Sequence, residues 1–217
     1  MIHLKLQHSP GTKLTVLCLG AHSDDIEIGC GGAILSLALQ YPGATFHWVV
    51  FSAIGIREAE ARRGASAFVG RDSLQQLTLK DFTDGFMPFS GAEIKRVFEE
   101  LKAAVSPDLI LTPSRNDAHQ DHRFIGELTW NTFRDHFILE YEIPKYDGDL
   151  GQPSAFWQLD AAVARKKADL LLDIFQSQHE KRWFGESTFM SLMRLRGMEC
   201  NAPSGYAEAF YARKLVL

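Results

Sequence analysis

The feature that most constrains the fold is a series of short apolar runs separated by longer helical patterns. Three runs, at 14–19 (LTVLCL), 46–51 (FHWVVF) and 108–112 (DLILT), are apolar at nearly every position. Runs of this length without alternation are typical of strands buried on both faces of a parallel sheet. We therefore expect a layered protein whose sheet is covered by helices on both sides.

The segments between these runs carry helical patterns. Residues 31–41 are apolar nearly all round, as in a packed helix, and residues 57–69 are charged mainly at their start. Residues 92–105, which precede Pro107, place apolar side chains three and four positions apart. These side chains are Ile94, Val97, Phe98, Leu101 and Val105.

With a further strand expected at 73–79, strands and helices alternate along the first part of the chain. This alternation predicts one α/β domain over residues 1–217, a Rossmann-like three-layer sandwich with a mostly parallel sheet and right-handed crossovers. The rest of the chain is less regular. There we expect a loop, two helices and a closing strand at a sheet edge, at 141–151, 159–176, 183–196 and 206–217.

Composition excludes several classes of protein. Of the 217 residues, 46% are hydrophobic and 23% charged, as in soluble globular proteins. The net charge of −4 provides no field that would hold nucleic acid or an anionic membrane. No apolar run approaches the roughly 20 residues of a membrane span, and no signal peptide is evident at the N-terminus. The three cysteines favour a reducing compartment, so we expect a cytoplasmic protein.

The first polar cluster directly follows the first expected strand. Residues 20–32 read GAHSDDIEIGCGG, with one histidine, two adjacent aspartates and glycines that open a helix. Taken alone, Asp24-Asp25 is typical of a helix N-cap. A glycine-rich turn also occurs in nucleotide-binding folds, but residues 29–32 lack the G-x-G-x-x-G spacing, and two acids would repel a pyrophosphate.

The second polar cluster follows the strand expected at 108–112. Residues 115–123 read RNDAHQDHR. Because the carboxyl ends of parallel strands lie at one edge of a sheet, we expect the two clusters to converge there. His22 and Asp25 are three positions apart, as are the two histidines of the second cluster, so each pair points the same way in a turn or first helical turn.

The residue types match metal catalysis. Two imidazoles and one carboxylate form a common catalytic zinc set that leaves a position for water. Asp24, beside such a ligand, is placed to deprotonate that water. The same set accepts ferrous iron, and 119–121 matches the H-x-D half of an iron facial triad, although the oxygenases that use it have jelly-roll sheets. We expect a metal site with zinc, and ferrous iron as the alternative ion.

Together these motifs resemble those of the PIG-L/LmbE-like family, zinc-dependent deacetylases that act on N-acetylglucosamine-type sugars. The resemblance rests on five stretches: AHSDDIE at 21–27, GG at 31–32, REAE at 57–60, DG at 84–85 and HQDH at 119–122. Ser23 stands where the family usually has proline, and Gly64 where it tends to have alanine. Neither departure removes a functional side chain, so both concern the rigidity of the loop rather than the chemistry.

The resemblance implies a metal centre and a general base. His22, Asp25 and His122 would bind the metal, and Asp24 would activate the water that attacks the amide. The expected activity is removal of an acetyl group from a small acetylated sugar or sugar conjugate, with release of acetate and a free amine. A monomer and a homo-oligomer both stay open.

The resemblance also implies four supporting residues. His119 would face the acetamide oxygen and, when protonated, stabilise the oxyanion. Asp121 would orient His119 and raise its pKa. Arg57 and Asp84 would contact sugar hydroxyls. Two other functions stay open, an amidohydrolase for another N-acyl amine and a non-catalytic nucleotide-binding module.

Overall fold

The computed structural model describes residues 3, 4, 6 and 13–216. Seven strands form one sheet in the order β3-β2-β1-β4-β5-β7-β6. They are β1 (Thr15–His22), β2 (Thr45–Ser52), β3 (Leu74–Leu79), β4 (Leu109–Pro113), β5 (Phe137–Tyr141), β6 (Ala155–Leu159) and β7 (Tyr206–Ala212). The first five strands pair in parallel, and β7 is antiparallel to both of its neighbours.

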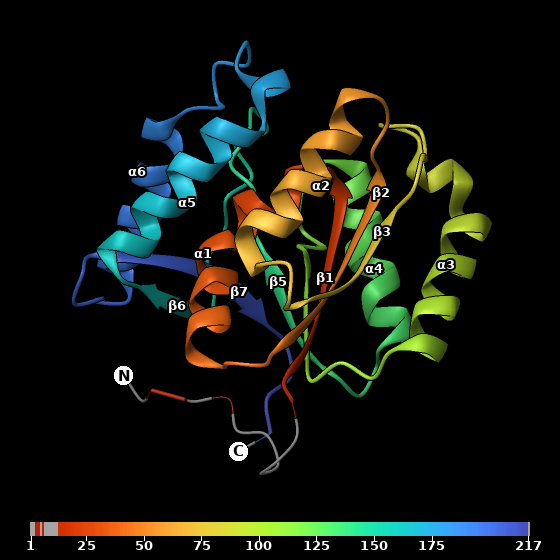
Figure 1. Cartoon of the computed structure of the whole chain (residues 1–217), viewed down its shortest axis with the longest axis horizontal. Coiled ribbons are helices and arrows are strands. Elements are labelled where there is room, and N and C mark those ends of the chain that lie inside the picture. The colour runs from red at the N-terminus through yellow and green to blue at the C-terminus, as the bar shows by residue number, and fades with distance from the viewer. Residues whose placement is uncertain (1–2, 5, 7–12, 217) are drawn as a thin grey trace.

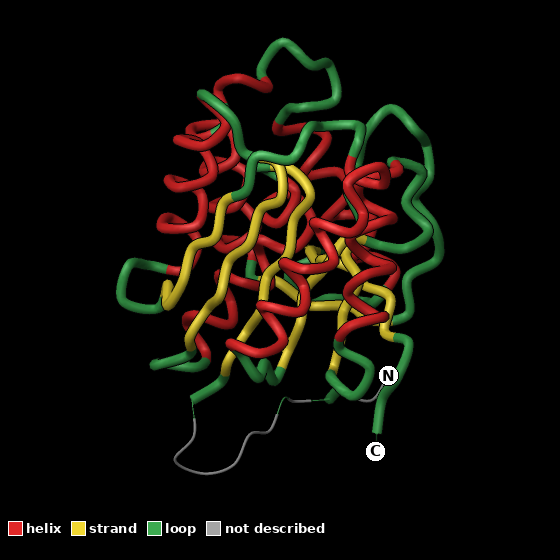
Figure 2. The backbone as a smooth tube through the Cα atoms, turned by 90° about the vertical axis from the view of Figure 1, so that its right-hand side faces the viewer, coloured by secondary structure: helices red, strands yellow, loops and turns green. Residues whose placement is uncertain are grey.

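Helices cover both faces of this sheet (Figures 1 and 2). The helices are α1 (Asp25–Gln40), α2 (Ile56–Val69), α3 (Gly91–Ala104), α4 (Gln120–Thr132), α5 (Ala161–Ile174) and α6 (Glu186–Glu199), with the short 3₁₀ helices η1 (Met87–Ser90) and η2 (Gln176–Gln178). α1, α2 and α5 pack on one face, and α3 and α4 on the other. None of the helices in the described part of the chain is long and apolar enough to cross a membrane.

The strands supply a separate hydrophobic core to each face. In β1, Val16 and Cys18 belong to the core under α1, α2 and α5, whereas Leu17 and Leu19 belong to the core under α3 and α4. Because successive side chains of a strand point to opposite faces, a strand between two helical layers must be apolar at every position. The predicted α/β sandwich with its mostly parallel sheet is therefore confirmed.

The strand order places a crevice at one edge of the sheet. The chain moves outward from β1 through β2 to β3, and then crosses back to β4 on the other side of β1. The loops that leave β1 and β4 consequently diverge at their carboxyl ends, where open α/β sheets bind ligands. This edge lies at the top of Figure 1.

One expectation about the later part of the chain was wrong, and two strands there were missed. The final strand does not lie at an edge, because β7 pairs with both β5 and β6. β5 and β6 themselves were not predicted. β5 is five residues long and includes Glu140, a buried carboxylate that is paired with Arg115 and Trp130. Those partners lie outside the strand, so the sequence of the strand alone gave no reason to expect that a charged residue would be buried there.

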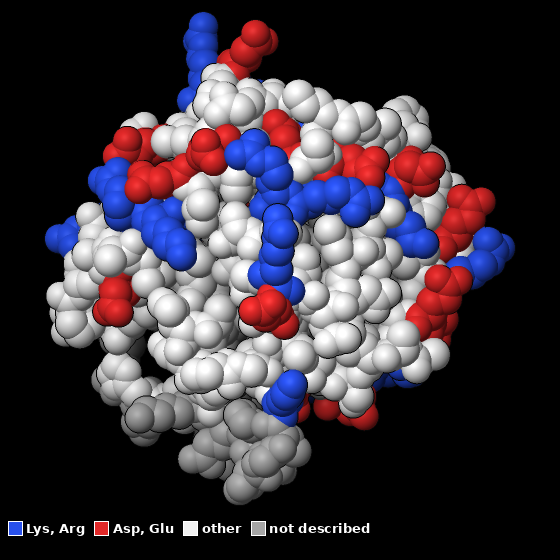
Figure 3. All heavy atoms as spheres, viewed as in Figure 1, with Lys and Arg blue, Asp and Glu red and all other residues white. Residues whose placement is uncertain are grey.

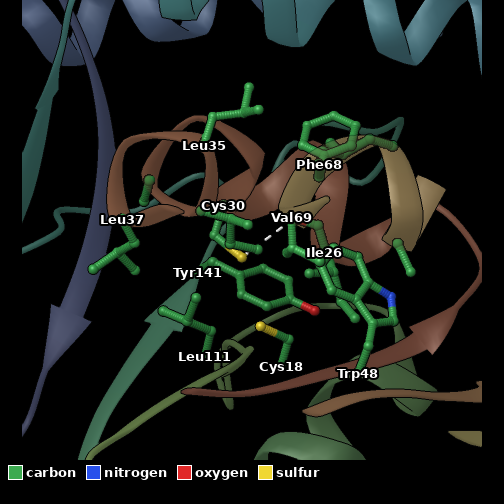
Figure 4. Packing of buried hydrophobic residues seen from close by; sticks show 14 of the residues in the cluster. Cys18, Ile26, Cys30, Leu35, Leu37, Trp48, Phe68, Val69, Leu111 and Tyr141 are labelled. Carbon is green, nitrogen blue, oxygen red and sulfur yellow. Dashed lines mark hydrogen bonds between the residues drawn. The ribbon is translucent and has the colours of Figure 1, made fainter. Parts of the chain in front are cut away.

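Helix α1 begins at Asp25, six residues before the predicted start, and it is kinked at Cys30. The kink lies where glycines allow close packing. A Cβ at Gly29 would lie 2.1 Å from the ring of Tyr141, and one at Gly31 would lie 2.4 Å from the ring of Phe68. Figure 4 shows Tyr141 packed beneath α1, close to Cys30. These glycines thus admit large side chains to a buried helix and are not open to a phosphate.

A buried ion pair supplies hydrogen bonds to backbone groups at the kink in α1. Lys167 Nζ donates to the carbonyl oxygen of Ile28 at 2.6 Å and pairs with Glu208 at 2.5 Å. The carboxylate of Glu208 accepts from the amides of Gly32 and Ala33, at 2.8 and 2.7 Å. The groups released by the interrupted helix are therefore satisfied from α5 and β7.

On the face seen in Figure 3, acidic and basic side chains lie side by side in a band across the upper half. No broad area of a single charge is visible there. This mixture agrees with the small net charge of −4, and it leaves that face without a strong field toward a polyanion.

Candidate metal centre and active site

The fold brings all eight predicted site residues to the carboxyl edge of the sheet. His22 ends β1, Asp24 caps α1, and His119 caps α4. The remaining residues lie in the first turns of three helices or in the loop after β3. The full set is His22, Asp24, Asp25, Arg57, Asp84, His119, Asp121 and His122.

The three predicted metal ligands face one another. His22 Nδ1 lies 3.1 Å from His122 Nε2, and these two nitrogens lie 3.5 and 3.3 Å from the two carboxylate oxygens of Asp25. An ion bound at about 2.0–2.2 Å in tetrahedral geometry separates its donor atoms by roughly 3.3 Å. The spacing of the two nitrogens therefore suits a divalent transition metal, and Asp25 faces each nitrogen with a different oxygen.

Other donors lie close enough to share this centre. One nitrogen from each of His22, His119 and His122 lies within 4.8 Å of the others. His22 also forms such a group with Asp84 and Asp121. The geometry thus places five candidate donors around His22, and Asp25 is distinguished by facing both His22 and His122.

The electrostatics of the centre favour a cation. Burial lowers the pKa of His122, but Asp25 and Asp117 outweigh it and raise that pKa to about 9. Burial is likewise outweighed at His22, whose pKa is raised well above its ordinary value by Asp25, Asp121 and Asp84. The pKa of Asp25 is lowered by the two imidazoles in spite of its burial. Carboxylates arranged in this way stabilise positive charge, whether on an imidazolium or on a metal.

The second nitrogen of His22 points toward the loop after β3. His22 Nε2 lies 2.9 Å from Asp84 Oδ1 and 3.3 Å from Asp121 Oδ2. The contact with His22 lowers the pKa of Asp84 to about 2. Asp121 also accepts from the backbone amides of Gly85 and Met87, at 2.7 and 3.2 Å. Asp121 therefore anchors the loop that carries Asp84 against the metal centre.

The structure describes a contact between Asp121 and His119, but not through the carboxylate that was predicted to orient the imidazole. The contact runs through the backbone, because the amide of Asp121 donates to His119 Nδ1 at 3.2 Å. The pKa of His119 is lowered, first by burial and then by His122 and His22, and the opposing effect of Asp121 is smaller. A neutral His119 whose Nδ1 accepts a hydrogen bond carries its proton on Nε2. It is therefore a donor without a positive charge.

Sequence reasoning missed the carboxylate that does support an imidazole. Asp117 Oδ2 lies 3.0 Å from His122 Nδ1, and Asp117 Oδ1 lies 2.9 Å from Lys145 Nζ. The imidazole of His122 and the ammonium of Lys145 lower the pKa of Asp117 in spite of its burial. Asp117 stands in the polar run at 115–123, which was its only signal. Lys145 lies in a stretch expected to be a loop, and nothing local marked it.

Arg57, which was predicted to contact a sugar hydroxyl, has a guanidinium group that is paired with carboxylates of the protein. Its guanidinium pairs with Asp24 at 2.5 Å and with Glu60 at 3.1 Å, and contacts Ser177 Oγ at 3.3 Å. Glu60 in turn accepts from the backbone amide of Ser177 at 2.8 Å. Asp24 is thus held by a network that links α2 to η2.

The two departures from the family pattern have local explanations. The hydroxyl of Ser23 donates to the carbonyl oxygen of Ser52 at 3.4 Å, which ties the turn after β1 to the end of β2. A Cβ at Gly64 would lie 2.1 Å from an oxygen of Glu27. Glu27 is fully buried, has no hydrogen-bond partner among the described residues, and has a pKa raised mainly by its burial. Gly64 therefore makes room for the buried carboxyl group of Glu27.

Solved structures share this fold at low sequence identity. A conserved protein from Thermus thermophilus is 21% identical, with a TM-score of 0.72 over 94% of this chain and 96% of that one. The N,N′-diacetylchitobiose deacetylase from Pyrococcus horikoshii is 18% identical, with a TM-score of 0.66 over 90% and 82%. GalB, the 4-carboxy-2-hydroxymuconate hydratase from Pseudomonas putida, is also 18% identical, with a TM-score of 0.68 over 94% and 98%. Because these neighbours include both a deacetylase and a hydratase, the fold alone does not select the reaction.

The sequence match is more specific than the fold. The model of the PIG-L family, described as GlcNAc-PI de-N-acetylase, matches residues 17–133. This segment runs from β1 to the end of α4 and contains every predicted site residue. The chain belongs to the PIG-L family.

Proposed function

We propose that this protein is a metal-dependent N-deacetylase that removes the acetyl group of an N-acetylglucosamine-like sugar. The observation that carries the proposal is the convergence of His22, Asp25 and His122 with Asp24 and His119 at one edge of the sheet. Membership of a family described by a de-N-acetylase supports amide hydrolysis over hydration. A structural neighbour named for the deacetylation of N,N′-diacetylchitobiose supports a sugar substrate.

His22, Asp25 and His122 would hold the metal ion. We propose zinc, with ferrous iron as the alternative, because two imidazoles and a carboxylate accept either ion. When bound, the ion would polarise the acetamide carbonyl and lower the pKa of a water molecule. Asp117 would keep His122 in place, since its carboxylate lies 3.0 Å from His122 Nδ1 and leaves Nε2 facing the centre.

Asp24 would be the general base. Its carboxylate lies beside the metal ligand Asp25 in sequence and is held by Arg57 at 2.5 Å. The ion pair engages Oδ1 and would restrict the carboxylate to one orientation, and the other oxygen would take the proton of the attacking water. The same proton would then be delivered to the leaving amine, so that acetate and a free amine are released.

His119 would stabilise the oxygen that becomes negative during the attack. Its Nδ1 accepts from the amide of Asp121, so Nε2 carries the proton and can donate to the acetamide oxygen. The imidazole packs on that of His122 with ring centroids 4.5 Å apart. His119 therefore lies next to the centre without needing a charge of its own.

The test is amine release from a panel of acetylated compounds by the purified, metal-loaded protein. The panel would include N-acetylglucosamine, N,N′-diacetylchitobiose, N-acetylated amino acids and simple N-acyl amines. We expect release from the sugars, with loss of activity on chelation and recovery on adding zinc or ferrous iron. Release only from non-sugar amides would favour the wider amidohydrolase class, and release from none would contradict the proposal.

A further inference from the structure

The segment at 142–152, between β5 and β6, contains a lysine that the proposed mechanism does not use. The side chain of Lys145 is only 9% exposed, whereas lysine side chains are seldom buried unless they are paired. Its ammonium lies 2.9 Å from Asp117 Oδ1 and 2.8 Å from Asp149 Oδ2, and it donates to the carbonyl oxygen of Ile143 at 3.4 Å. An ammonium has three protons to donate, so each of them has an acceptor here.

Asp117 lies between this ammonium and two histidines of the candidate metal centre. Its Oδ1 also accepts from the backbone amide of His119 at 2.8 Å, and its Oδ2 lies 3.0 Å from His122 Nδ1. One carboxylate therefore contacts the backbone of the proposed oxyanion donor and the ring of a proposed metal ligand. Because the two oxygens of a carboxylate rotate together, an ammonium that holds Oδ1 also determines where Oδ2 points.

Lys145 supplies the contact of Asp117 that is not local. Among the described residues, the other partners of the Asp117 side chain are the two histidines, which lie within five positions of it. These local contacts move with the loop after β4, so they do not fix that loop against the rest of the molecule. Asp149 contacts the next residue as well, because its Oδ2 accepts from the backbone amide of Ala118 at 2.6 Å. The segment at 142–152 therefore holds the loop after β4 at two successive residues.

We propose that Lys145 is a positioning residue of the metal centre, which acts through Asp117 to keep the imidazole of His122 turned toward the ion. The inference rests on the proposed function and goes beyond it by giving a role to the segment between β5 and β6. This segment lies outside residues 17–133, the part of the chain that matches the family model. The orientation of a ligand within that part thus depends on a residue outside it.

Two effects of removing the ammonium oppose each other, which makes the direction of the change informative. A positive charge near a cation site repels the ion, so its loss alone would tighten metal binding. Loss of position has the opposite sign. Without the ammonium, the carboxylates of Asp117 and Asp149 are buried like charges that move apart, and His122 loses its support.

The first test is the zinc affinity of Lys145→Met, measured on the full chain by competition with a chelator. Methionine keeps most of the apolar stem and removes the charge. We expect the affinity to fall about tenfold, at the low end of the usual effect of altering a group that supports a metal-binding imidazole. An affinity equal to or higher than that of wild type would overturn the proposal.

Two variants control for charge and for stability. Lys145→Arg keeps a cation that can donate to both carboxylates, so it should retain most of the affinity. Lys167→Met removes another buried lysine, which is paired with Glu208 and has no contact with Asp117 in the described part of the chain. It should lower the stability and keep the zinc affinity of wild type. An equal fall in affinity in Lys167→Met would show that stability alone explains the result, and would overturn the proposal.

A second pair of variants applies if Lys145→Met does not fold. The double variant Lys145→Met/Asp149→Asn removes the repulsion between the two buried carboxylates. It is compared with Asp149→Asn, whose side-chain oxygen can still accept from the amide of Ala118. The double variant should bind zinc about tenfold more weakly than the single one, and equal affinities would overturn the proposal.

The second test is the visible absorption spectrum of the cobalt(II)-loaded protein, which depends on how the ligands are arranged around the ion. The spectrum should change in Lys145→Met and stay that of wild type in Lys145→Arg and Lys167→Met. A wild-type spectrum in Lys145→Met would overturn the proposal. Neither test requires turnover, so the two proposals can fail separately: amine release by wild type decides the proposed function, and metal binding by the variants decides the role of Lys145.

Discussion

The two ends of the sheet differ in how they contribute to the molecule. β3, β2, β1 and β4 are parallel, alternate with helices, and send all eight predicted site residues to the carboxyl edge. β5, β7 and β6 are the antiparallel part of the same sheet, and buried ion pairs lie beside them instead. These pairs are Lys167 of α5 with Glu208 of β7, and Arg196 of α6 with Glu142 after β5. The difference suggests that reacting groups come from one end of the sheet and much of their support from the other.

Contacts across the sheet join the two ends. Tyr141, at the end of β5, donates its hydroxyl to the carbonyl oxygen of Leu19 in β1 at 2.6 Å. Lys167 from α5 and Glu208 from β7 satisfy the broken helix α1, whose first residue is Asp25. If this division is correct, substitutions at the catalytic end should change turnover, and substitutions at the supporting end should change stability.

The largest effect is expected from removing a proposed metal ligand. His22→Ala should lose the metal and with it all measurable activity, because the two remaining ligands cannot hold the ion in place. Metal content per chain and amine release would be measured together. A variant that keeps one metal per chain would show that His22 is not a ligand, and would favour a donor set without it.

Asp24→Asn should leave metal binding intact and lower kcat by about 10³-fold, since an amide cannot act as the general base. The matched control is Asp72→Asn, an exposed aspartate outside the site. Metal content and circular dichroism would confirm that both variants are folded and loaded. Near-normal turnover by Asp24→Asn would remove Asp24 from the mechanism.

At the supporting end, Lys167→Met should lower the free energy of unfolding by about 3 kcal/mol, because it leaves the Glu208 carboxylate buried without its partner. Urea denaturation would measure the change. The double variant Lys167→Met/Glu208→Gln should recover part of the loss. At a temperature where the protein is folded, kcat should stay within a few fold of wild type, and a loss as large as that of Asp24→Asn would break the comparison between the two ends.

The smallest effect is expected from Asp117→Asn, which keeps the shape of the side chain but removes the charge behind His122. Metal affinity should fall by about 10–100-fold, the usual consequence of altering a carboxylate that supports a metal-binding imidazole. Competition with a chelator would measure it, and kcat at saturating metal should change less than the affinity. An unchanged affinity would mean that His122 is oriented by its helix alone.

The parts of the site that could be predicted were those encoded locally. His22 and Asp25 follow one buried strand, His122 follows another, and strands of this kind end at a common edge. Asp117 could have been suspected because it stands in the same polar run as His122. Lys145 could not, because it reaches Asp117 from a stretch between β5 and β6 that carries no regular pattern.

The fold shows the same division. Three of the first four strands, β1, β2 and β4, were predicted because both of their faces are buried, which leaves a nearly unbroken apolar run in the sequence. β3, an edge strand with exposed glutamines, has no such run. β5 was missed because Glu140 interrupts its run, and the place of β7 was wrong because no local signal states which strands it will pair with. Strand order depends on the paths of the connecting segments. Those paths are set by how the helices and loops pack on the sheet, which local sequence patterns do not encode.

By itself, the sequence determined the α/β class, the residue types of the candidate metal site and the edge of the sheet where they meet, since all three follow from local patterns and from the geometry of parallel strands. The tertiary structure decided the partner of each charged group. It placed Asp121 against His22 and the loop after β3, Asp117 against His122, and Arg57 against Asp24. These pairings join residues through the folding of distant loops, and buried carboxylates accept whichever donors that folding brings within reach.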